Sequence, residues 1–446
     1  MNWSLGDIAD VLGLRTDSAA QVCTGVSIDS RTIHEGELFV AISGPNFDGT
    51  DYIEAARQSG ATAALTTRQV DSSLPQLIVG DTLQALHQLA SAWRRKFAAV
   101  TTIGITGSNG KTTMRSLVQA LCGADTHATR GNLNNHLGVP LVVFGLGPEH
   151  RYAVIEMGAN HIGEIAVLAA LAKPTIGIVT NAGPAHLEGF GSLDGVAQGK
   201  GEMFEALDAD STAVINRDDR YFDYWLGRAE PAEVITFGST SSADVWYSDY
   251  RPVDGGGQFA LHHAEQTFDV RLQLEGEHNA MNCAAACAAG LAAGLEWSTF
   301  ATRLASVVPV DGRLHRLSLH SEVEVIDDSY NANPASMRAA IESLVAGASQ
   351  PWAVLGDMLE LGDGAVEEHR ALGAFCREAG VQRLFAFGTF SAALCDGFGA
   401  DSEAFEDMSE LNASLLKALV PDVTIGVKGS RSTRMERVVE FLREQF

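Results

Sequence analysis

The run Ile103-Gly104-Ile105-Thr106-Gly107-Ser108-Asn109-Gly110-Lys111-Thr112-Thr113 decides how the rest of this 446-residue chain is interpreted. It follows an apolar, β-branched stretch at residues 100–105 and opens a helical pattern at 112–122. A glycine-rich turn between a strand and a helix presents backbone N–H groups to phosphate oxygens. The run therefore predicts a phosphate-binding loop, in which Lys111 neutralises the β- and γ-phosphates and the Thr112 hydroxyl binds Mg²⁺.

The loop departs from the usual pattern at one position. The common motif has a glycine where this chain has Ile105, but the Thr-Gly-x-x-Gly-Lys-Thr core is intact. A variant of the motif is therefore a better interpretation than an ordinary glycine-rich turn. We expect the whole loop to hold the nucleotide phosphates: Gly107, Ser108, Asn109, Gly110, Lys111, Thr112 and Thr113.

Alternating strand and helix patterns on both sides of the loop indicate an α/β protein. In such a protein, buried strands form a parallel sheet that helices cover on both faces. A polar stretch at 240–275 interrupts the alternation and predicts a hairpin or a small separate sheet. The alternation resumes after residue 311. We expect a small α/β domain at residues 1–81, a central doubly wound parallel-sheet domain at 82–310 and a C-terminal Rossmann-like domain at 311–446.

The charge balance limits the possible partners. Lys plus Arg is 31 and Asp plus Glu is 56, so the net charge is −25. This excess of acid argues against nucleic acid and anionic membranes as partners, but not against small anions that local groups hold. The cysteines lack zinc-binding spacing, the N-terminus lacks a signal-peptide pattern, and no apolar run approaches the roughly 20 residues of a membrane helix. We expect a cytoplasmic monomer.

Two further candidates follow strands of the central unit. Glu156 ends the strand pattern at 152–156, and His186 follows the one at 176–180. Both positions belong to the carboxyl edge of a parallel sheet, where ligands bind. Each residue has the chemistry of a metal ligand. A solvated acid at a strand end is an equal alternative for Glu156, and a hydrogen-bonded loop histidine is favoured for His186 taken alone.

Three more positions have weaker signals of their own. Lys200 lies between two glycines that would let a bulky group approach, although a surface lysine is the usual explanation. Arg313 lies at the expected hinge, where a guanidinium could reach phosphates once the domains close, although a lone arginine is more often a surface residue. The segment Asp327-Asp328-Ser329-Tyr330-Asn331-Ala332-Asn333-Pro334 suits ribose and adenine, or else simply caps a helix.

Together these segments resemble the Mur ligase family, the ATP-dependent amide-forming enzymes of peptidoglycan synthesis. The resemblance covers essentially the whole chain and implies a UDP-sugar-binding domain, a central ATPase and a mobile C-terminal domain. It rests on motifs in the family's order: residues 106–113, Gly131-Asn132-Leu133-Asn134-Asn135, Glu156, His186, Lys200, Gly276-Glu277-His278-Asn279, Arg313 and Asp328.

The resemblance also implies roles for the matching residues. Lys111, His186 and Lys200 are implied to be catalytic. Thr112 and Glu156 would bind one Mg²⁺, and His186 would help to bind a second. Lys200 matches a lysine that is carbamylated in several relatives, which would make it a metal ligand. The other implied contacts are Asn279 and Asp328 with adenine and ribose, Arg313 with phosphate, and Ser30, Arg31, Asp48, Asn134 and Asn331 with substrate.

Segments at both ends of the chain favour one branch of the family. Asp29-Ser30-Arg31 and Phe47-Asp48-Gly49 resemble the UDP-binding domain shared by the third and fourth Mur ligases. The Asp-Asn-Pro-Arg signature of the diamino-acid-adding branch is absent from the sequence. The branch that adds D-alanyl-D-alanine is matched by residues 327–334, Gly356-Asp357-Met358-Leu359-Glu360-Leu361-Gly362 and Lys428-Gly429-Ser430-Arg431-Ser432.

The implied reaction joins D-Ala-D-Ala to the tripeptide carboxylate of UDP-N-acetylmuramoyl-tripeptide through an acyl phosphate, with ATP and two Mg²⁺ ions. It is a cytoplasmic step of cell-wall synthesis, and so bears on cell shape and division. The alternatives are the diamino-acid-adding ligase, a folylpolyglutamate synthase and, from another class, a P-loop kinase or a nucleotide-gated switch.

Overall fold

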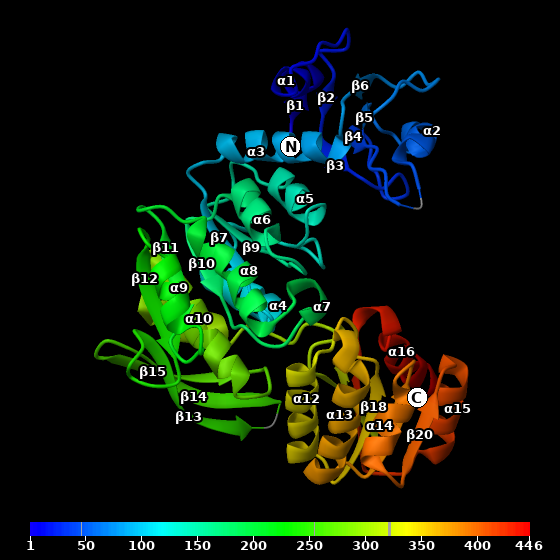
Figure 1. The fold of residues 1–446 in the computed structure, drawn as a ribbon. Coiled ribbons are helices and arrows are strands. Elements are labelled where there is room, and N and C mark those ends of the chain that lie inside the picture. Colours follow the sequence, from blue (N-terminus) through cyan, green and yellow to red (C-terminus); the bar gives the residue numbers. More distant parts are fainter. Residues whose placement is uncertain (46, 254, 320–322) are drawn as a thin grey trace.

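Three bodies, each with its own sheet, make up the molecule in a computed structural model that describes residues 1–45, 47–253, 255–319 and 323–446. Figure 1 shows the N-terminal body in blue, the central body in cyan and green, and the C-terminal body in yellow to red. The α/β fold class predicted from the sequence is confirmed. Within the described residues, no helix has the length and apolar character needed to cross a membrane.

The N-terminal body is built on a four-stranded parallel sheet in the order β3-β4-β5-β6. A short antiparallel pair, β1 and β2, lies beside it, and Ser4 caps α1 by accepting a hydrogen bond from the Asp7 amide. The elements are β1 (Trp3–Ser4), α1 (Leu5–Val11), β2 (Val22–Cys23), β3 (Gly25–Ser27), β4 (Glu37–Val40), η1 (Gly49–Tyr52), α2 (Ile53–Gln58), β5 (Ala63–Thr66) and β6 (Gln76–Ile78).

The long helix α3 (Thr82–Lys96) joins the N-terminal body to the central one, as Figure 1 shows. Its buried Arg94 donates hydrogen bonds to the carbonyl oxygens of Ala172 at 2.7 Å and Val100 at 3.2 Å. One guanidinium thus satisfies a carbonyl at the end of a helix and another before a strand, which ties α3 to the central body.

The central body contains a nine-stranded sheet in the order β15-β14-β13-β12-β11-β10-β7-β9-β8. The polar stretch at 240–275 forms hairpins, β13 to β15, but these do not make a separate sheet. Strand β13 pairs with β12 in parallel through Phe237–Val245, which extends the central sheet. The strands are β7 (Thr101–Thr106), β8 (Thr126–Ala128), β9 (Tyr152–Glu156), β10 (Ile176–Val179), β11 (Thr212–Asn216), β12 (Glu233–Gly238), β13 (Val245–Val253), β14 (Gly256–His263) and β15 (Gln266–Leu272).

Helices cover both faces of the central sheet. Alternate strand residues face opposite cores: Val154 packs with α4 and α10, whereas Ile155 packs with α3, α5, α6 and α8. The helices are α4 (Lys111–Cys122), α5 (Gly138–Phe144), α6 (Glu164–Ala172), α7 (Leu187–Phe190), α8 (Leu193–Glu205), α9 (Phe222–Arg228), α10 (His278–Ala292), η2 (Trp297–Thr299) and α11 (Phe300–Leu304).

The C-terminal body has a six-stranded sheet in the order β16-β17-β21-β18-β19-β20, in which β16 alone runs antiparallel. Helices α12 to α14 cover one face, and α15 and α16 cover the other. The elements are β16 (His315–Ser318), β17 (Val323–Asp328), α12 (Pro334–Gly347), β18 (Gln350–Gly356), η3 (Gly362–Gly364), α13 (Ala365–Ala379), β19 (Arg383–Phe387), α14 (Ser391–Phe398), β20 (Ser402–Phe405), α15 (Met408–Ala418), β21 (Val423–Lys428), η4 (Arg431–Thr433) and α16 (Glu436–Gln445).

Candidate functional site

The predicted phosphate-binding loop connects β7 to α4 at the carboxyl edge of the central sheet. Gly107 has φ +147°, and a Cβ there would lie 1.9 Å from Thr180 Oγ1. Gly110 adopts φ +81° at the N-cap of α4. Both positions therefore require glycine. Ile105, which stands where the common motif has glycine, is a buried residue of β7 and precedes the loop. This departure therefore leaves the loop backbone free to surround a phosphate.

Lys111 lies folded over the loop. Its ammonium donates hydrogen bonds to the carbonyl oxygens of Gly107 at 2.7 Å and Ser108 at 3.4 Å. Burial lowers the pKa of Lys111, while the nearby Glu156 carboxylate opposes that shift. The ammonium is thus held against the carbonyl oxygens of the loop.

Glu156 is buried, with 2% of its surface exposed, so the alternative of a solvated acid is wrong. Its carboxylate accepts hydrogen bonds from Thr112 Oγ1 at 3.2 Å and from Asn134 Nδ2 at 2.8 Å, and Arg115 lies 3.6 Å away. A hydroxyl beside a carboxylate is the oxygen donor set that Mg²⁺ prefers. No cluster of three or more metal-binding side chains occurs among the described residues. Phosphates and water would therefore complete such a coordination shell, as is usual for Mg²⁺.

Lys200 is also buried, with 1% of its surface exposed, which excludes an ordinary surface lysine. It lies on α8, and its ammonium donates to the carbonyl oxygen of Ala159 at 3.1 Å, 5.0 Å from the centroid of the Phe190 ring. A Cβ at Gly199 would lie 2.5 Å from this ring, so the glycine makes room for it. Burial lowers the pKa of Lys200 well below its ordinary value, which favours the neutral amine.

His186 joins the central body to the C-terminal one. Its Nδ1 bonds to the carboxylate of Glu360, and the backbone N–H of Glu188 donates to the Glu360 carbonyl at 3.4 Å. The hydrogen bond with His186 lowers the pKa of Glu360. A second bridge runs from Asn333 Nδ2 to Asn109 Oδ1 at 2.7 Å. The loop and His186 are therefore both in contact with the C-terminal body.

A cavity of about 310 Å³ lies between these two bodies on one side of the loop. Asn279 and Asp328, the expected adenine and ribose contacts, both line it. Asp328 forms a buried ion pair with Lys428 at 2.5 Å, and burial lowers the pKa of that lysine. The mixed lining suits a nucleoside. Its apolar wall includes Leu274, Val307, Val308, Val310, Ala335 and Ala339.

A second, more polar cavity of about 580 Å³ lies on the other side of the loop. Arg313 lines both cavities; it lies 3.3 Å from Thr112 Oγ1 and 4.0 Å from the centre of the Tyr330 ring. A nucleotide with its base in the first cavity would carry its phosphates across the loop into the second. Predicted residues that line the second cavity are Ser108, Asn109, Gly110, Lys111, Asn134, Glu156, His186, Arg313 and Asn331.

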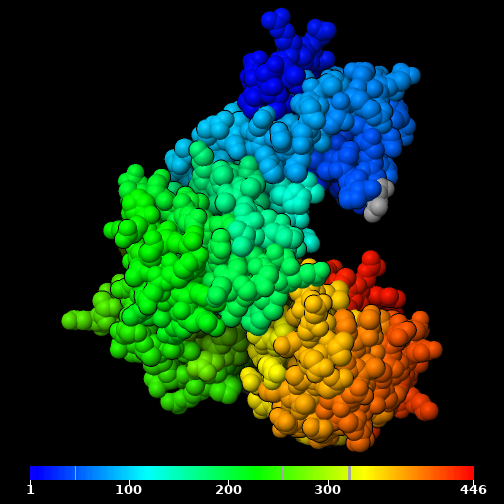
Figure 2. Space-filling model, in the orientation of Figure 1, coloured from blue at the N-terminus to red at the C-terminus, as the bar shows by residue number. Residues whose placement is uncertain are grey.

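The structure does not bring the three N-terminal candidates to the loop. Arg31 is exposed and pairs with Asp29 at 2.7 Å. Asp48 caps η1 by accepting from the Thr50 amide at 2.9 Å. Ser30 lies beside Arg31 in the same body, and Figure 2 shows a notch between this body and the C-terminal one. A ligand would have to span this notch to reach both ends.

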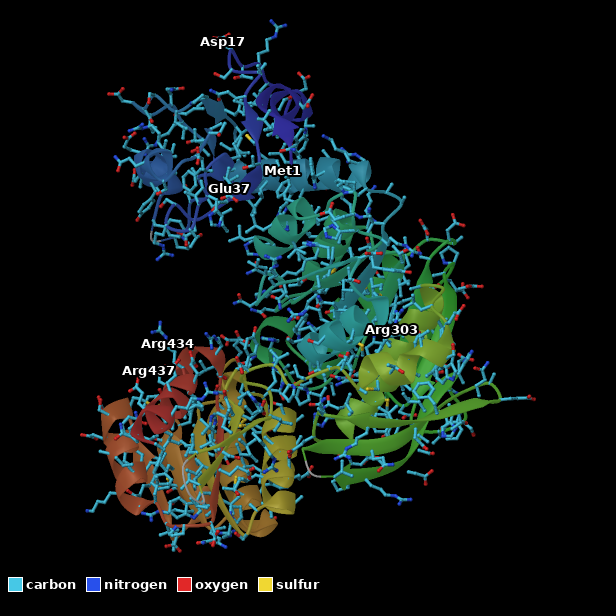
Figure 3. All side chains as sticks on the ribbon, turned by 180° about the vertical axis from the view of Figure 1, so that it is seen from behind. Met1, Asp17, Glu37, Arg303, Arg434 and Arg437 are labelled. Atoms are coloured by element: carbon cyan, nitrogen blue, oxygen red, sulfur yellow. The ribbon has the colours of Figure 1, made fainter. Side chains whose placement is uncertain are left out.

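Three residues of the site have no individual role in the predictions from sequence. Glu360, Lys428 and Asn333 lie within segments that resemble the family, but their types alone do not indicate the contacts that they make. A signal was present, because each follows or ends a strand of the C-terminal sheet, β18, β21 or β17, at its carboxyl edge. Figure 3 labels Arg434 and Arg437 on the side of the C-terminal body that faces the N-terminal one.

Comparisons with known proteins identify the family. Residues 105–290 match the Mur ligase middle domain, 312–431 the Mur ligase glutamate ligase domain, and 22–97 the Mur ligase family catalytic domain. The UDP-N-acetylmuramoyl-tripeptide–D-alanyl-D-alanine ligase of Escherichia coli (strain K12) is 38% identical over 448 residues, which span 99% of this chain and 98% of that protein. The chain belongs to the Mur ligase family.

Solved structures of Mur ligases share its fold along the whole chain. A crystal structure of MurF from Acinetobacter baumannii is 32% identical, has a TM-score of 0.92, and covers 100% of this chain and 99% of its own. MurF from Thermotoga maritima, solved in complex with ADP, is 27% identical with a TM-score of 0.81, and covers 94% and 97%. A folylpolyglutamate synthase of Mycobacterium tuberculosis, at 18% identity and a TM-score of 0.65, shares the fold over 80% of this Mur ligase.

Proposed function

We propose that this Mur ligase uses ATP to join the amino group of D-Ala-D-Ala to the tripeptide carboxylate of UDP-N-acetylmuramoyl-tripeptide, a step of peptidoglycan precursor synthesis. The observation that carries the proposal is a pair of cavities that meet at the phosphate-binding loop and share Asn109, Gly110 and Arg313. This arrangement suits a reaction in which a γ-phosphate meets a second substrate. The names of its relatives give the substrates.

The proposal assigns a task to each part of the chain. Residues 1–81 bind the UDP-sugar with Ser30, Arg31 and Asp48, residues 82–310 bind ATP, and residues 311–446 close over the site. The enzyme works as a monomer in the cytoplasm and binds neither nucleic acid nor membrane, in keeping with its net charge of −25.

The first chemical step makes the carboxylate reactive. A carboxylate is a poor electrophile, so its oxygen attacks the γ-phosphorus, ADP leaves, and an acyl phosphate forms. Two anions approach each other in this step. Lys111 and the loop N–H groups neutralise the transferring phosphoryl group, and Arg313 beside Thr112 adds a second cation.

The residues around Glu156 fit a metal ion. Thr112 and Glu156 would hold one Mg²⁺, which would offset the repulsion between phosphate and carboxylate. His186 and Lys200 would serve a second ion. As a cation, Lys200 is unsuited to this role, but its buried neutral amine can add to CO₂. The new N–C bond and the loss of one proton would convert it into a carbamate anion.

In the second step, the amine of D-Ala-D-Ala attacks the acyl carbon and phosphate leaves through a tetrahedral intermediate. The C-terminal body supplies much of the lining on this side, including Tyr330, Asn331 and Arg431. This body also contacts the loop through Asn333, and its closure would limit the access of water to the reactive acyl phosphate.

The test of the function is phosphate release with ATP and UDP-N-acetylmuramoyl-tripeptide, with and without D-Ala-D-Ala. We expect release to require both substrates, and mass spectrometry to find the pentapeptide product. A stable phosphorylated product would indicate a kinase. Slow hydrolysis that ignores the amine would indicate a switch. Turnover with the dipeptide precursor and a diamino acid would indicate the sibling ligase.

The test of the carbamate is Lys200→Ala with added short-chain carboxylates. We expect an inactive variant that acetate or formate partly restores, because the free carboxylate replaces the carbamate. Full activity of Lys200→Ala without any addition contradicts the assignment.

A further inference from the structure

The hydrogen bond between His186 and Glu360 uses one nitrogen of the imidazole ring, Nδ1. The Glu360 carboxylate bonds to Nδ1, and among the residues that the structure describes no other hydrogen bond reaches the His186 ring. Both side chains line the polar cavity beside the loop. A carboxylate accepts and cannot donate, so the neutral ring must carry its proton on Nδ1. The lone pair is then on Nε2.

The backbone of both residues is unusual as well. His186 has φ +54° and Glu360 has φ +62°. Both values lie in the left-handed region, which residues other than glycine rarely adopt. The Glu188 amide also donates to the Glu360 carbonyl, so the two segments are joined by main chain and side chain together. Strained backbone of this kind persists where surrounding contacts hold it and is concentrated at functional sites.

We propose that Glu360 is a positioning residue, which the C-terminal body contributes to the catalytic centre in order to fix the tautomer and orientation of His186. Docking of the C-terminal body places the carboxylate on Nδ1 and thereby makes Nε2 the nitrogen with the free lone pair. The inference rests on the proposed function only in what Nε2 then binds, which is the second metal ion.

Such a partner changes what the imidazole can do. A carboxylate on one ring nitrogen raises the basicity of the other and fixes the ring, and loss of a partner of this type usually costs about 10–100-fold in metal affinity. Because the partner comes from another body of the molecule, the ability of His186 to bind the second metal ion is coupled to the position of that body. Two other hydrogen bonds between the bodies, from Asn333 to Asn109 and from the Glu188 amide to the Glu360 carbonyl, do not involve the Glu360 side chain. We therefore expect its removal to alter the ring without separating the bodies.

The first experiment measures the tautomer directly. Protein labelled with ¹⁵N-histidine is examined by long-range ¹H–¹⁵N correlation NMR at pH 8.5, without nucleotide or metal, and His186→Gln assigns the signal. We expect the Nδ1–H tautomer in the wild type. Glu360→Ala should change it to Nε2–H, the form preferred in water. Glu360→Gln should retain Nδ1–H, because its amide oxygen still accepts.

Glu188→Gln is the matched control. It removes the same charge from a residue two positions from His186 and leaves the backbone hydrogen bond in place. We expect the wild-type tautomer in this variant. The proposal is overturned if the wild type has the Nε2–H form, or if a folded Glu360→Ala protein keeps Nδ1–H.

The second experiment counts metal ions by the EPR signal of free Mn²⁺, titrated against the protein with a non-hydrolysable ATP analogue. We expect the weaker of two Mn²⁺ sites to lose about 10–100-fold in affinity in Glu360→Ala and to change little in Glu360→Gln and Glu188→Gln. Unchanged Mn²⁺ affinity in Glu360→Ala overturns the metal role of Nε2. The tautomer is measured without substrate, so failure of the proposed ligase reaction would leave that result interpretable.

Discussion

The charged side chains are buried at one end of the proposed substrate path and exposed at the other. Lys428, at the junction of the central and C-terminal bodies, and Lys200, within the central body, are almost fully buried, and each is held by a carbonyl or a carboxylate. In the N-terminal body, the Arg31 side chain is 85% exposed and pairs only with its neighbour Asp29 among the described residues. The proposed chemistry thus lies beside buried charges, and the proposed recognition of the UDP-linked substrate lies beside exposed ones.

The contrast has an energetic meaning. Coulomb interactions are strong in a buried site, and fixed charges there need no reorganisation when a phosphoryl group moves. An exposed ion pair contributes about 0–1 kcal/mol. We therefore expect substitutions at the junction to change the rate of reaction, and those in the N-terminal body to change the affinity for substrate.

Lys111→Ala should have the largest effect. It removes the ammonium that lies against the loop, so we expect at least about a 10³-fold loss of ATP-dependent ligation. Phosphate release measures the activity, and circular dichroism should give an unchanged fold. Near-normal turnover in this variant would refute the loop assignment and, with it, the contrast between the two ends.

Gly107→Ala tests the shape of the same loop. Its Cβ would lie 1.9 Å from Thr180 Oγ1, so the loop must shift, and we expect kcat/KM for ATP to fall about 10²-fold. Gly123→Ala is the matched control. Gly123 also has a positive φ, with φ +84° and ψ −158°, but a Cβ there would meet no atom within 4 Å, so this variant should lose about 1–3 kcal/mol of stability and keep its activity. Equal loss of activity in both would contradict the role of the loop.

Arg31→Ala tests the opposite end. We expect KM for the UDP-linked substrate to rise by up to about tenfold, equivalent to about 1.4 kcal/mol, with kcat unchanged. Steady-state kinetics with the substrate varied at saturating ATP measures both constants. A fall in kcat at constant KM would place Arg31 in the chemical step, against the contrast between the two ends.

The smallest effect concerns the Asp29–Arg31 pair itself. Arg31 lowers the pKa of Asp29 from 3.8 to about 2. Because the folded pKa is the lower one, the stabilisation is complete above 3.8 and is lost as pH falls towards 2. The pair is exposed, so we expect Asp29→Asn to cost less than about 0.5 kcal/mol in urea unfolding at pH 7 and less still at pH 2, where the folded-state carboxyl is about half protonated. A loss of the same size at both pH values would indicate a contribution other than charge.

Most of the fold could be predicted because its signals are local. Strand β9 begins and ends at residues 152 and 156, as its pattern predicts. Helix α4 begins one residue before the predicted range 112–122 and ends with it. The hairpins at 240–275 could be predicted, but their place in the central sheet could not, because the pairing of β13 with β12 leaves no periodic pattern in the sequence.

Individual residues of the site could be predicted from the sequence, but the contacts between distant segments could not. The loop and Glu156 could be placed, because a strand that ends in a parallel sheet fixes which edge its last residue joins. The burial of Lys200 could not, because a lysine in a helix is usually exposed, and the Phe190 ring that covers it comes from another helix. The bond between His186 and Glu360 spans 174 residues, beyond any local pattern.

The apolar wall of the cavity of about 310 Å³, the proposed site of the adenine base, has one more consequence. Val307, Val308 and Val310 belong to the connection between α11 and β16, so in the proposed complex the base would contact the connection about which the C-terminal body would turn. Turning that connection reshapes the surface beneath the base. ADP would then leave at the rate of this rotation. Product release, and not bond formation, would limit the turnover rate of the enzyme.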